Sequence, residues 1–220
     1  MALVMFDLDG TLLDTVGEIA DATNRTLADY QLPAVSTDQV RDWIGHGTGW
    51  LMRAAWTSVA GDPDADQWAQ VMKRFVGHYF DCAGSDSRPY PGVRNALAEL
   101  QRLGIKRAVV TNKETRFTER ILERHGLTEC FDLVISGDTY PVKKPDPTVI
   151  YNCLAAFGMH AGEALFVGDS SIDVATAKAA GVVCWAVPYG YNMGEPIQAA
   201  EPDRIIATCE EVPSFFKGMT

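Results

Sequence analysis

The sequence predicts an α/β protein in which a parallel sheet has helices on both faces and an all-helical insert follows the first strand. Three observations predict this class. Short apolar runs end abruptly in polar residues, helical patterns alternate with these runs, and one long stretch has helical patterns alone. The length of 220 residues corresponds to roughly one and a half typical domains, which suits either one large domain or a core with a small appendage.

The strands are predicted from short runs that are mostly β-branched or aromatic, as expected for strands buried on both faces. These runs cover residues 2–6, 107–110, 133–135, 164–167 and 182–187. Helical patterns between them end before Gly104, Gly126 and Gly181, because glycine favours the position after a helix. Strict alternation of strand and helix indicates a parallel sheet.

The insert is predicted from residues 15–81, which show no strand pattern. Ser36 and Gln39 form a capping box that starts a helix ending near Gly45, and further helices are expected over 51–59 and 64–80. About 65 residues are more than a crossover needs. We therefore predict a core of residues 1–14 and 84–220 and a helical cap of residues 15–83.

Composition narrows the possible partners. The chain has 19 Lys and Arg against 29 Asp and Glu, a net charge of −10, which argues against binding to nucleic acid or to an anionic membrane. The five cysteines are scattered without a C-x-x-C pair, so neither a disulfide framework nor a zinc site is expected. The amino terminus lacks the basic region of a signal peptide, and we expect a cytoplasmic protein that is a monomer or a homodimer.

The first predicted strand ends in two carboxylates. Asp7 and Asp9 share one face of the extended chain, at the strand end where open α/β sheets bind ligands. Two such carboxylates favour a divalent cation, or they raise one pKa until that group acts as an acid. Gly10 lets the backbone turn sharply and bring amides near a ligand. Alone, the run can also be an ordinary Asp-rich turn.

Polar residues follow the other strands in the same way. They are Thr111 and Asn112 after the second strand, Lys144 before Pro145 after the third, and Asp169, Ser170 and Asp173 after the fourth. Each has an ordinary interpretation, as a helix cap or as a solvated lysine. Together they supply phosphate-binding and Mg²⁺-binding groups at one edge of the sheet.

These residues resemble four motifs of the haloacid dehalogenase superfamily of aspartyl-phosphate phosphatases. The matching segments are Asp7-Leu8-Asp9-Gly10-Thr11, Thr111, Lys144 and Gly168-Asp169 with Asp173. The resemblance implies a Rossmann-like core. The helical insert resembles the cap of phosphoglycolate phosphatase-like members, as do Tyr90-Pro91-Gly92 and Thr111-Asn112-Lys113.

The resemblance also implies a role for each motif residue. Asp7 is the nucleophile that forms an aspartyl-phosphate, and Asp9 is the general acid and then the general base. Mg²⁺ is bound by Asp7, the Asp9 carbonyl and Asp169. Phosphoryl oxygens are bound by Gly10, Thr111, the Asn112 amide and Lys144. Asp173 and Ser170 support the loop or Lys144.

The expected activity is hydrolysis of 2-phosphoglycolate or of another small phosphorylated metabolite. The second aspartate, Asp9, argues against a dehalogenase, because the hydrolytic dehalogenases of this superfamily lack it. A phosphonoacetaldehyde hydrolase needs a cap lysine for a Schiff base, and the only cap lysine here, Lys73, falls in the middle of a predicted helix, which disfavours that activity. A β-phosphoglucomutase-like isomerase stays open, whereas the chain length disfavours a non-catalytic phospho-accepting domain. In the cap, Gly45 and His46 resemble a specificity loop, and Arg53 is a candidate anion clamp.

Overall fold

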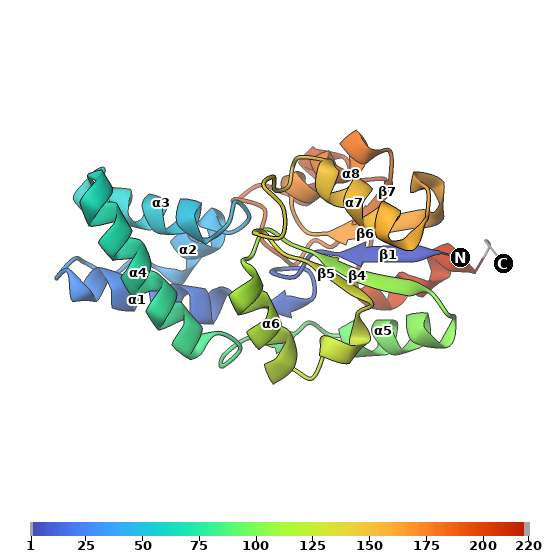
Figure 1. Ribbon diagram of the computed structural model, residues 1–220, viewed down its shortest axis with the longest axis horizontal. Coiled ribbons are helices and arrows are strands. Elements are labelled where there is room, and N and C mark those ends of the chain that lie inside the picture. The colour runs from blue at the N-terminus through green and yellow to red at the C-terminus, as the bar shows by residue number, and fades with distance from the viewer. Residues whose placement is uncertain (1, 218–220) are drawn as a thin grey trace.

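The computed structural model describes residues 2–217, which form a six-stranded parallel sheet with a helical group beside it (Figure 1). The strand order is β5-β4-β1-β6-β7-β8, so β1 lies in the middle between β4 and β6. The sheet strands are β1 (Leu3–Phe6), β4 (Lys106–Val110), β5 (Leu133–Ile135), β6 (Ala164–Gly168), β7 (Val183–Ala186) and β8 (Arg204–Ile205).

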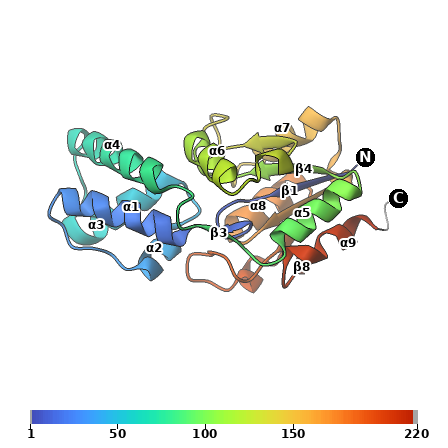
Figure 2. The ribbon, with the colours of Figure 1, turned by 90° about the horizontal axis from the view of Figure 1, so that it is seen from below.

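Helices cover both faces of this sheet. One face carries α7 (Thr148–Phe157) and α8 (Ser171–Ala180), and the other carries α5 (Val93–Arg102), α6 (Thr115–Arg124) and α9 (Pro213–Phe216). Figure 2 shows α5 and α9 side by side on their face. Short 3₁₀ turns lie at Thr128–Cys130, Ala161–Glu163, Ile197–Ala200 and Cys209–Glu211.

The central strand explains the continuous apolar run at the start of the chain. Leu3 and Met5 pack into the apolar cluster under α7 and α8, whereas Val4 and Phe6 pack into the cluster under α5 and α6. All four side chains are fully buried. A strand buried on both faces has no polar alternation, and it places the residue after it, Asp7, at the edge of the sheet.

The helical group consists of the four helices that follow β1. They are α1 (Val16–Asp29), α2 (Thr37–Trp43), α3 (Thr48–Ala60) and α4 (Ala65–Cys82). α1 packs along α4, and their buried residues join the apolar cluster of the α5 and α6 face. The predicted Ser36 capping box is present, with the Gln39 amide donating to Ser36 Oγ at 3.2 Å.

Several elements differ from the sequence-based expectation. The helix predicted to end near Gly45 ends at Trp43. An antiparallel pair, β2 (Leu13–Asp14) and β3 (Arg88–Pro89), joins the two connections of the helical group. The sequence patterns did not single out β2, β3, β8 or α7, because two-residue strands carry no periodicity and α7 lacks a polar N-cap.

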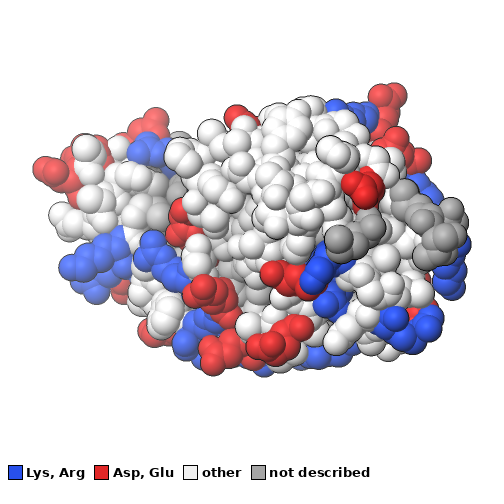
Figure 3. Space-filling view, turned by 45° about the vertical axis from the view of Figure 1, so that its right-hand side comes forward, with Lys and Arg blue, Asp and Glu red and all other residues white. Residues whose placement is uncertain are grey.

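The surface carries charges of both signs. On the face in Figure 3, acidic and basic side chains are interspersed along the edges, around a broad region of other residues. Within residues 2–217, the structure has no helix long and apolar enough to cross a membrane.

Glu18 links α1 to the segment that returns to the core. It is buried, with 1% of its surface exposed, and its Oε2 accepts hydrogen bonds from the backbone amides of Gly84 at 2.8 Å and Ser87 at 3.1 Å. Glu18→Ala should therefore lower the free energy of unfolding by about 3 kcal/mol, because these backbone amides lose their buried hydrogen-bond acceptor. Urea unfolding measures the change, with the exposed Glu119→Ala as control. Equal effects of the two substitutions would refute the linking role.

Candidate active site

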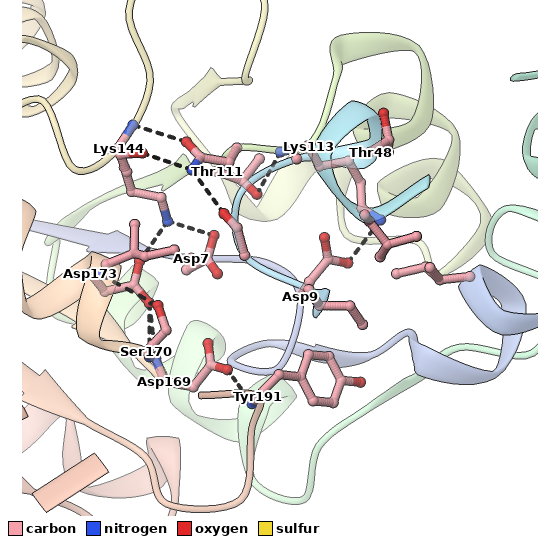
Figure 4. Close-up of a pocket in the computed structure, with 17 residues that line it drawn as sticks. Asp7, Asp9, Thr48, Thr111, Lys113, Lys144, Asp169, Ser170, Asp173 and Tyr191 are labelled. Atoms are coloured by element: carbon pink, nitrogen blue, oxygen red, sulfur yellow. Dashed lines mark hydrogen bonds and ion pairs between the residues drawn. The ribbon is translucent and has the colours of Figure 1, made fainter. Parts of the chain in front are cut away.

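One pocket lies at the carboxyl ends of β1, β4 and β6, where these strands face the helical group (Figure 4). It encloses a cavity of ≈ 40 Å³, which suits a small ligand. The lining combines charged residues of the strand ends with apolar residues of the helical group. The residues are Asp7, Asp9, Ile19, Ile44, Gly45, Gly47, Thr48, Leu51, Thr111, Asn112, Lys113, Lys144, Asp169, Ser170, Ile172, Asp173 and Tyr191.

Asp7 lies at the centre of the charged half of the pocket. Its backbone N–H donates to the Val167 carbonyl of β6 at 2.9 Å, which continues the pairing of β1 with its neighbour. Its Oδ1 lies 2.8 Å from Lys144 Nζ, but the contact lacks hydrogen-bond geometry, so this buried oxygen has no donor among the described residues. Burial raises the pKa of Asp7 from 3.8 to about 6, against the opposing charge of Lys144.

Both the backbone and the side-chain ammonium of Lys144 are held in place in the pocket. Its ammonium lies between Asp7 and Asp173, with Nζ 2.6 Å from Asp173 Oδ1. The Asn112 side chain accepts from the Lys144 amide and donates to the Lys144 carbonyl, both at 2.9 Å. Burial alone would lower the pKa of Lys144, but the charges of Asp173 and Asp7 raise it above its ordinary value. The ammonium is therefore a fixed, permanent cation.

Asp173 shapes the loop between β6 and α8. Its Oδ2 accepts from the amides of Asp169 and Ser170 at 3.2 and 3.1 Å and from Ser170 Oγ at 2.7 Å. Ser170 is the N-cap of α8 and forms a capping box with Asp173. Because both oxygens of Asp173 are engaged, this residue positions Lys144 and the loop.

Asp169 is the third carboxylate of the cluster. It accepts from Thr11 Oγ1 at 2.6 Å through one oxygen and from the Tyr191 amide at 2.5 Å through the other. Burial, reinforced by the charges of Asp173 and Asp7, raises its pKa well above the ordinary value. Oxygens of Asp7, Asp169 and Asp173 all lie within 4.8 Å of one another. Three carboxylates with one ammonium leave a local excess of negative charge that suits a divalent cation.

Asp9 lies on the other side of Asp7, towards the helical group (Figure 4). Its Oδ1 accepts from Thr15 Oγ1 at 2.6 Å and lies 2.9 Å from Lys113 Nζ. Lys113 Nζ also donates to the hydroxyl of Tyr79, which comes from α4. Burial, followed by the charge of Asp9, raises the pKa of Tyr79 well above its ordinary value, so this hydroxyl is neutral.

The loop between α2 and α3 meets the core at the pocket. The Gly45 carbonyl accepts from Asn112 Nδ2 at 2.9 Å, and Thr48 Oγ1 donates to Glu114 Oε1 at 2.5 Å. Ile44, Leu51 and Ile19 of the helical group supply apolar lining. The loop between α2 and α3 therefore covers one side of the pocket, and the hydrogen bond of its Gly45 carbonyl to Asn112 attaches it to the carboxyl end of the sheet.

Most of the predicted site residues converge, but three do not line the pocket. The Gly10 amide donates to the Leu13 carbonyl at 2.9 Å, so this glycine, with φ +83°, serves the turn and its N–H is not offered to a ligand. His46 is exposed beside the Trp50 ring at 5.0 Å. Arg53 is exposed, lies 4.5 Å from the centre of the Trp68 ring and pairs with Asp62 at 3.4 Å.

Lys113 and Tyr191 line the pocket although sequence reasoning assigned them no role. Lys113 belongs to the Thr111-Asn112-Lys113 segment that carries the family resemblance, but the sequence does not show that its side chain points into the pocket. Tyr191 gave no signal, because it lies in a loop 22 residues beyond Asp169. Its hydroxyl accepts from the amides of Thr15 and Val16 at 2.9 and 3.1 Å and donates to Asp14. Tyr191 thus connects Asp169 with the start of α1.

Comparison with known proteins assigns the family. The haloacid dehalogenase-like hydrolase family matches residues 4–187. Phosphoglycolate phosphatases of Pseudomonas savastanoi pv. phaseolicola and Aliivibrio fischeri are 42% and 41% identical, covering 93% and 91% of this chain and 75% and 90% of their own lengths. A crystal structure from Haemophilus somnus, described as a predicted phosphoglycolate phosphatase, has TM-score 0.95 and 32% identity over 99% of this chain and 98% of its own. The chain belongs to the haloacid dehalogenase-like hydrolases.

Proposed function

We propose that this phosphatase hydrolyses a small phosphomonoester through an aspartyl-phosphate on Asp7, with 2-phosphoglycolate as the preferred substrate. The observation that carries the proposal is the central position of Asp7, buried at the end of β1 between the fixed ammonium of Lys144 and the second carboxylate, Asp9. A carboxylate beside a permanent cation can approach a phosphate dianion, because the cation offsets their mutual repulsion.

The chemistry requires two displacements. The Asp7 carboxylate attacks phosphorus and the bond from phosphorus to the ester oxygen breaks, while Asp9 gives its proton to that oxygen. Asp9 then takes a proton from water, which attacks the aspartyl-phosphate, so that inorganic phosphate leaves and Asp7 is restored. Thr111, the Asn112 amide and Lys144, all in the pocket lining, are proposed to bind the phosphoryl oxygens.

We propose Mg²⁺ as the cofactor, bound by Asp7, Asp169 and the Asp9 carbonyl. The donor set fits, because Asp7 Oδ1 is buried and accepts no hydrogen bond from the described residues, although the Lys144 ammonium lies 2.8 Å away. Burial also raises the pKa of Asp7, so the carboxylate lacks full charge compensation. Asp173 is left out, since its Oδ1 pairs with the Lys144 ammonium and its Oδ2 accepts three hydrogen bonds from the β6–α8 loop. Each oxygen of Asp169 accepts one neutral donor and keeps a lone pair for a cation. The bound cation would supply charge neutralisation between carboxylate and phosphate.

The preference for 2-phosphoglycolate rests on the names of the relatives and on the size of the pocket. The two relatives at 42% and 41% identity are phosphoglycolate phosphatases. The whole pocket encloses ≈ 40 Å³, which suits a small phosphomonoester with a short leaving group. Five unpaired cysteines, four of them buried, support a reducing, cytoplasmic location.

A phosphate-release panel tests the proposal. Purified protein with Mg²⁺ should release phosphate from 2-phosphoglycolate faster than from hexose phosphates or nucleotides, and EDTA should lower the rate by at least about 100-fold. Full recovery on adding Mg²⁺ back is the control for irreversible damage. A higher kcat/KM with a sugar phosphate, or isomerisation of β-glucose 1-phosphate, would overturn the substrate assignment. Full turnover in EDTA would overturn the metal assignment.

A further inference from the structure

A second buried lysine, Lys113, lies in the pocket without a part in the phosphoryl transfer proposed above. Its side chain is 2% exposed, and its Nζ lies 2.9 Å from Asp9 Oδ1. In Figure 4 the order across the pocket is Lys144, Asp7, Asp9 and Lys113, so the two ammonium groups lie at opposite ends. Lys144 is therefore at the phosphoryl end and Lys113 at the leaving-group end.

The ammonium of Lys113 has capacity for one more partner. An ammonium carries three N–H donors, and among the described residues the Tyr79 hydroxyl and Asp9 take two of them. Asp9 does not depend on Lys113 alone, because Thr15 Oγ1 donates to the same carboxylate at 2.6 Å. One donor of Lys113 thus remains for a ligand in the pocket, and a shift of Nζ towards that ligand leaves Asp9 bonded.

The other surroundings of Lys113 explain which ligand this donor would suit. Towards the helical group the pocket is lined by the apolar side chains of Ile19, Ile44 and Leu51. Lys113 and Lys144 are the only Lys or Arg residues among the described residues lining the pocket. Lys144 lies between Asp7 and Asp173, where it is proposed to bind the phosphoryl oxygens at the other end of the pocket. An anionic group on the leaving side can therefore be neutralised by Lys113 alone, in a buried setting where charge pairing is strong.

We propose that Lys113 binds the carboxylate of the leaving group and is the residue that selects small phosphorylated acids. The proposal rests on the proposed function, in which Asp9 contacts the ester oxygen. In 2-phosphoglycolate the carboxyl carbon is two bonds from that oxygen, which brings the carboxylate to the side of Asp9 where Lys113 lies. A neutral leaving group would leave the donor unused and the ammonium less well compensated.

The test compares 2-phosphoglycolate with its primary amide, which has nearly the same shape and no charge. In the wild-type protein, kcat/KM for the acid should exceed that for the amide by about 100-fold. Lys113→Met should lose about 100-fold with the acid and less than about tenfold with the amide, so that the preference vanishes. Lys113→Arg should keep part of the preference, and Lys143→Met, which removes an exposed lysine nearby, should keep all of it.

Product inhibition gives a second readout that a merely structural role would not move. Glycolate should inhibit the wild-type protein and lose its effect on Lys113→Met, whereas the inhibition constant of inorganic phosphate should be unchanged. Equal losses for acid and amide would overturn the proposal and assign Lys113 to Asp9 alone. Poor wild-type turnover of 2-phosphoglycolate would instead overturn the proposed function, which separates the two failures.

Discussion

Replacing Asp7 by Asn is expected to abolish phosphate release and, at the same time, to stabilise the metal-free protein. The loss of turnover should be at least about 10⁴-fold, because an amide oxygen does not replace the carboxylate nucleophile. Asn has nearly the same shape, so the pocket should keep its packing. Phosphate release with Mg²⁺ measures the activity.

The gain in stability follows from the buried position of Asp7. Burial raises its pKa from 3.8 to about 6, so the folded protein binds this proton more tightly than the unfolded chain does. The wild-type protein consequently loses stability as the pH rises from about 4 to above 6, and Asp7→Asn lacks this loss. At pH 7.5 in EDTA the variant should be more stable by about 1–3 kcal/mol, and below pH 4 the difference should disappear.

Mg²⁺ and a surface control complete this test. Adding Mg²⁺ should stabilise the wild-type protein by more than it stabilises Asp7→Asn, since the variant lacks one proposed ligand. Asp81→Asn makes the same change of charge at an exposed position of α4 and should alter neither property by much. A variant that keeps measurable single-turnover burst kinetics, or one that is less stable than wild type at pH 7.5, would contradict the role assigned to Asp7.

The sequence alone was enough to predict at which edge of the sheet the site lies. Parallel strands end together, so residues that follow β1, β4 and β6 converge wherever those strands are neighbours, as the pairing of β1 with β4 and β6 shows. Asp7, Thr111 and Asp169 therefore lie together because of the strand order, whatever the directions of their side chains. The all-parallel order followed from the alternation of strands and helices in the same way.

Side-chain directions in the loops could not be predicted in this way. The Asn112 side chain hydrogen-bonds to the backbone of Lys144, 32 residues away, a contact that the expected phosphate-binding role of the Asn112 amide does not indicate. His46, in the loop between α2 and α3, and Arg53, in α3, had suitable chemistry, but their directions depend on tertiary packing that no short pattern encodes. Lys113 was overlooked for the converse reason, since only tertiary contacts with Tyr79 and Asp9 direct it into the pocket.

Lys144→Met should have the opposite effect on stability, although it too should remove activity. The ammonium lies within 2.8 Å of Asp7 and 2.6 Å of Asp173, and methionine leaves the three buried carboxylates without it. Taking one partner out of a buried ion cluster typically costs about 3–5 kcal/mol. Turnover should fall by at least about 10³-fold, because the fixed cation that neutralises the phosphoryl group is gone.

The cost of this substitution should depend on pH and on metal. Lys144 is the main group that lowers the pKa of Asp7, so its loss raises that pKa beyond about 6. The folded variant then binds protons more tightly than its unfolded chain, and the penalty should shrink as the pH falls from 7.5 to 5. Mg²⁺ should reduce the penalty as well, because the cation replaces part of the missing positive charge. Urea unfolding at both pH values, with EDTA and with Mg²⁺, measures these changes.

A double variant shows whether the stability penalty of Lys144→Met comes from uncompensated buried charge or from poor packing of the methionine. If repulsion among carboxylates causes the penalty, Asp7→Asn should stabilise the Lys144→Met protein by more than it stabilises the wild-type protein, because one of the uncompensated charges is gone. If the methionine merely packs badly against Phe166, whose ring centre lies 5.4 Å from Nζ, the second substitution should recover nothing beyond its own effect. Lys143→Met is the matched surface control, and a penalty as large as that of Lys144→Met would contradict the account given for the buried ammonium.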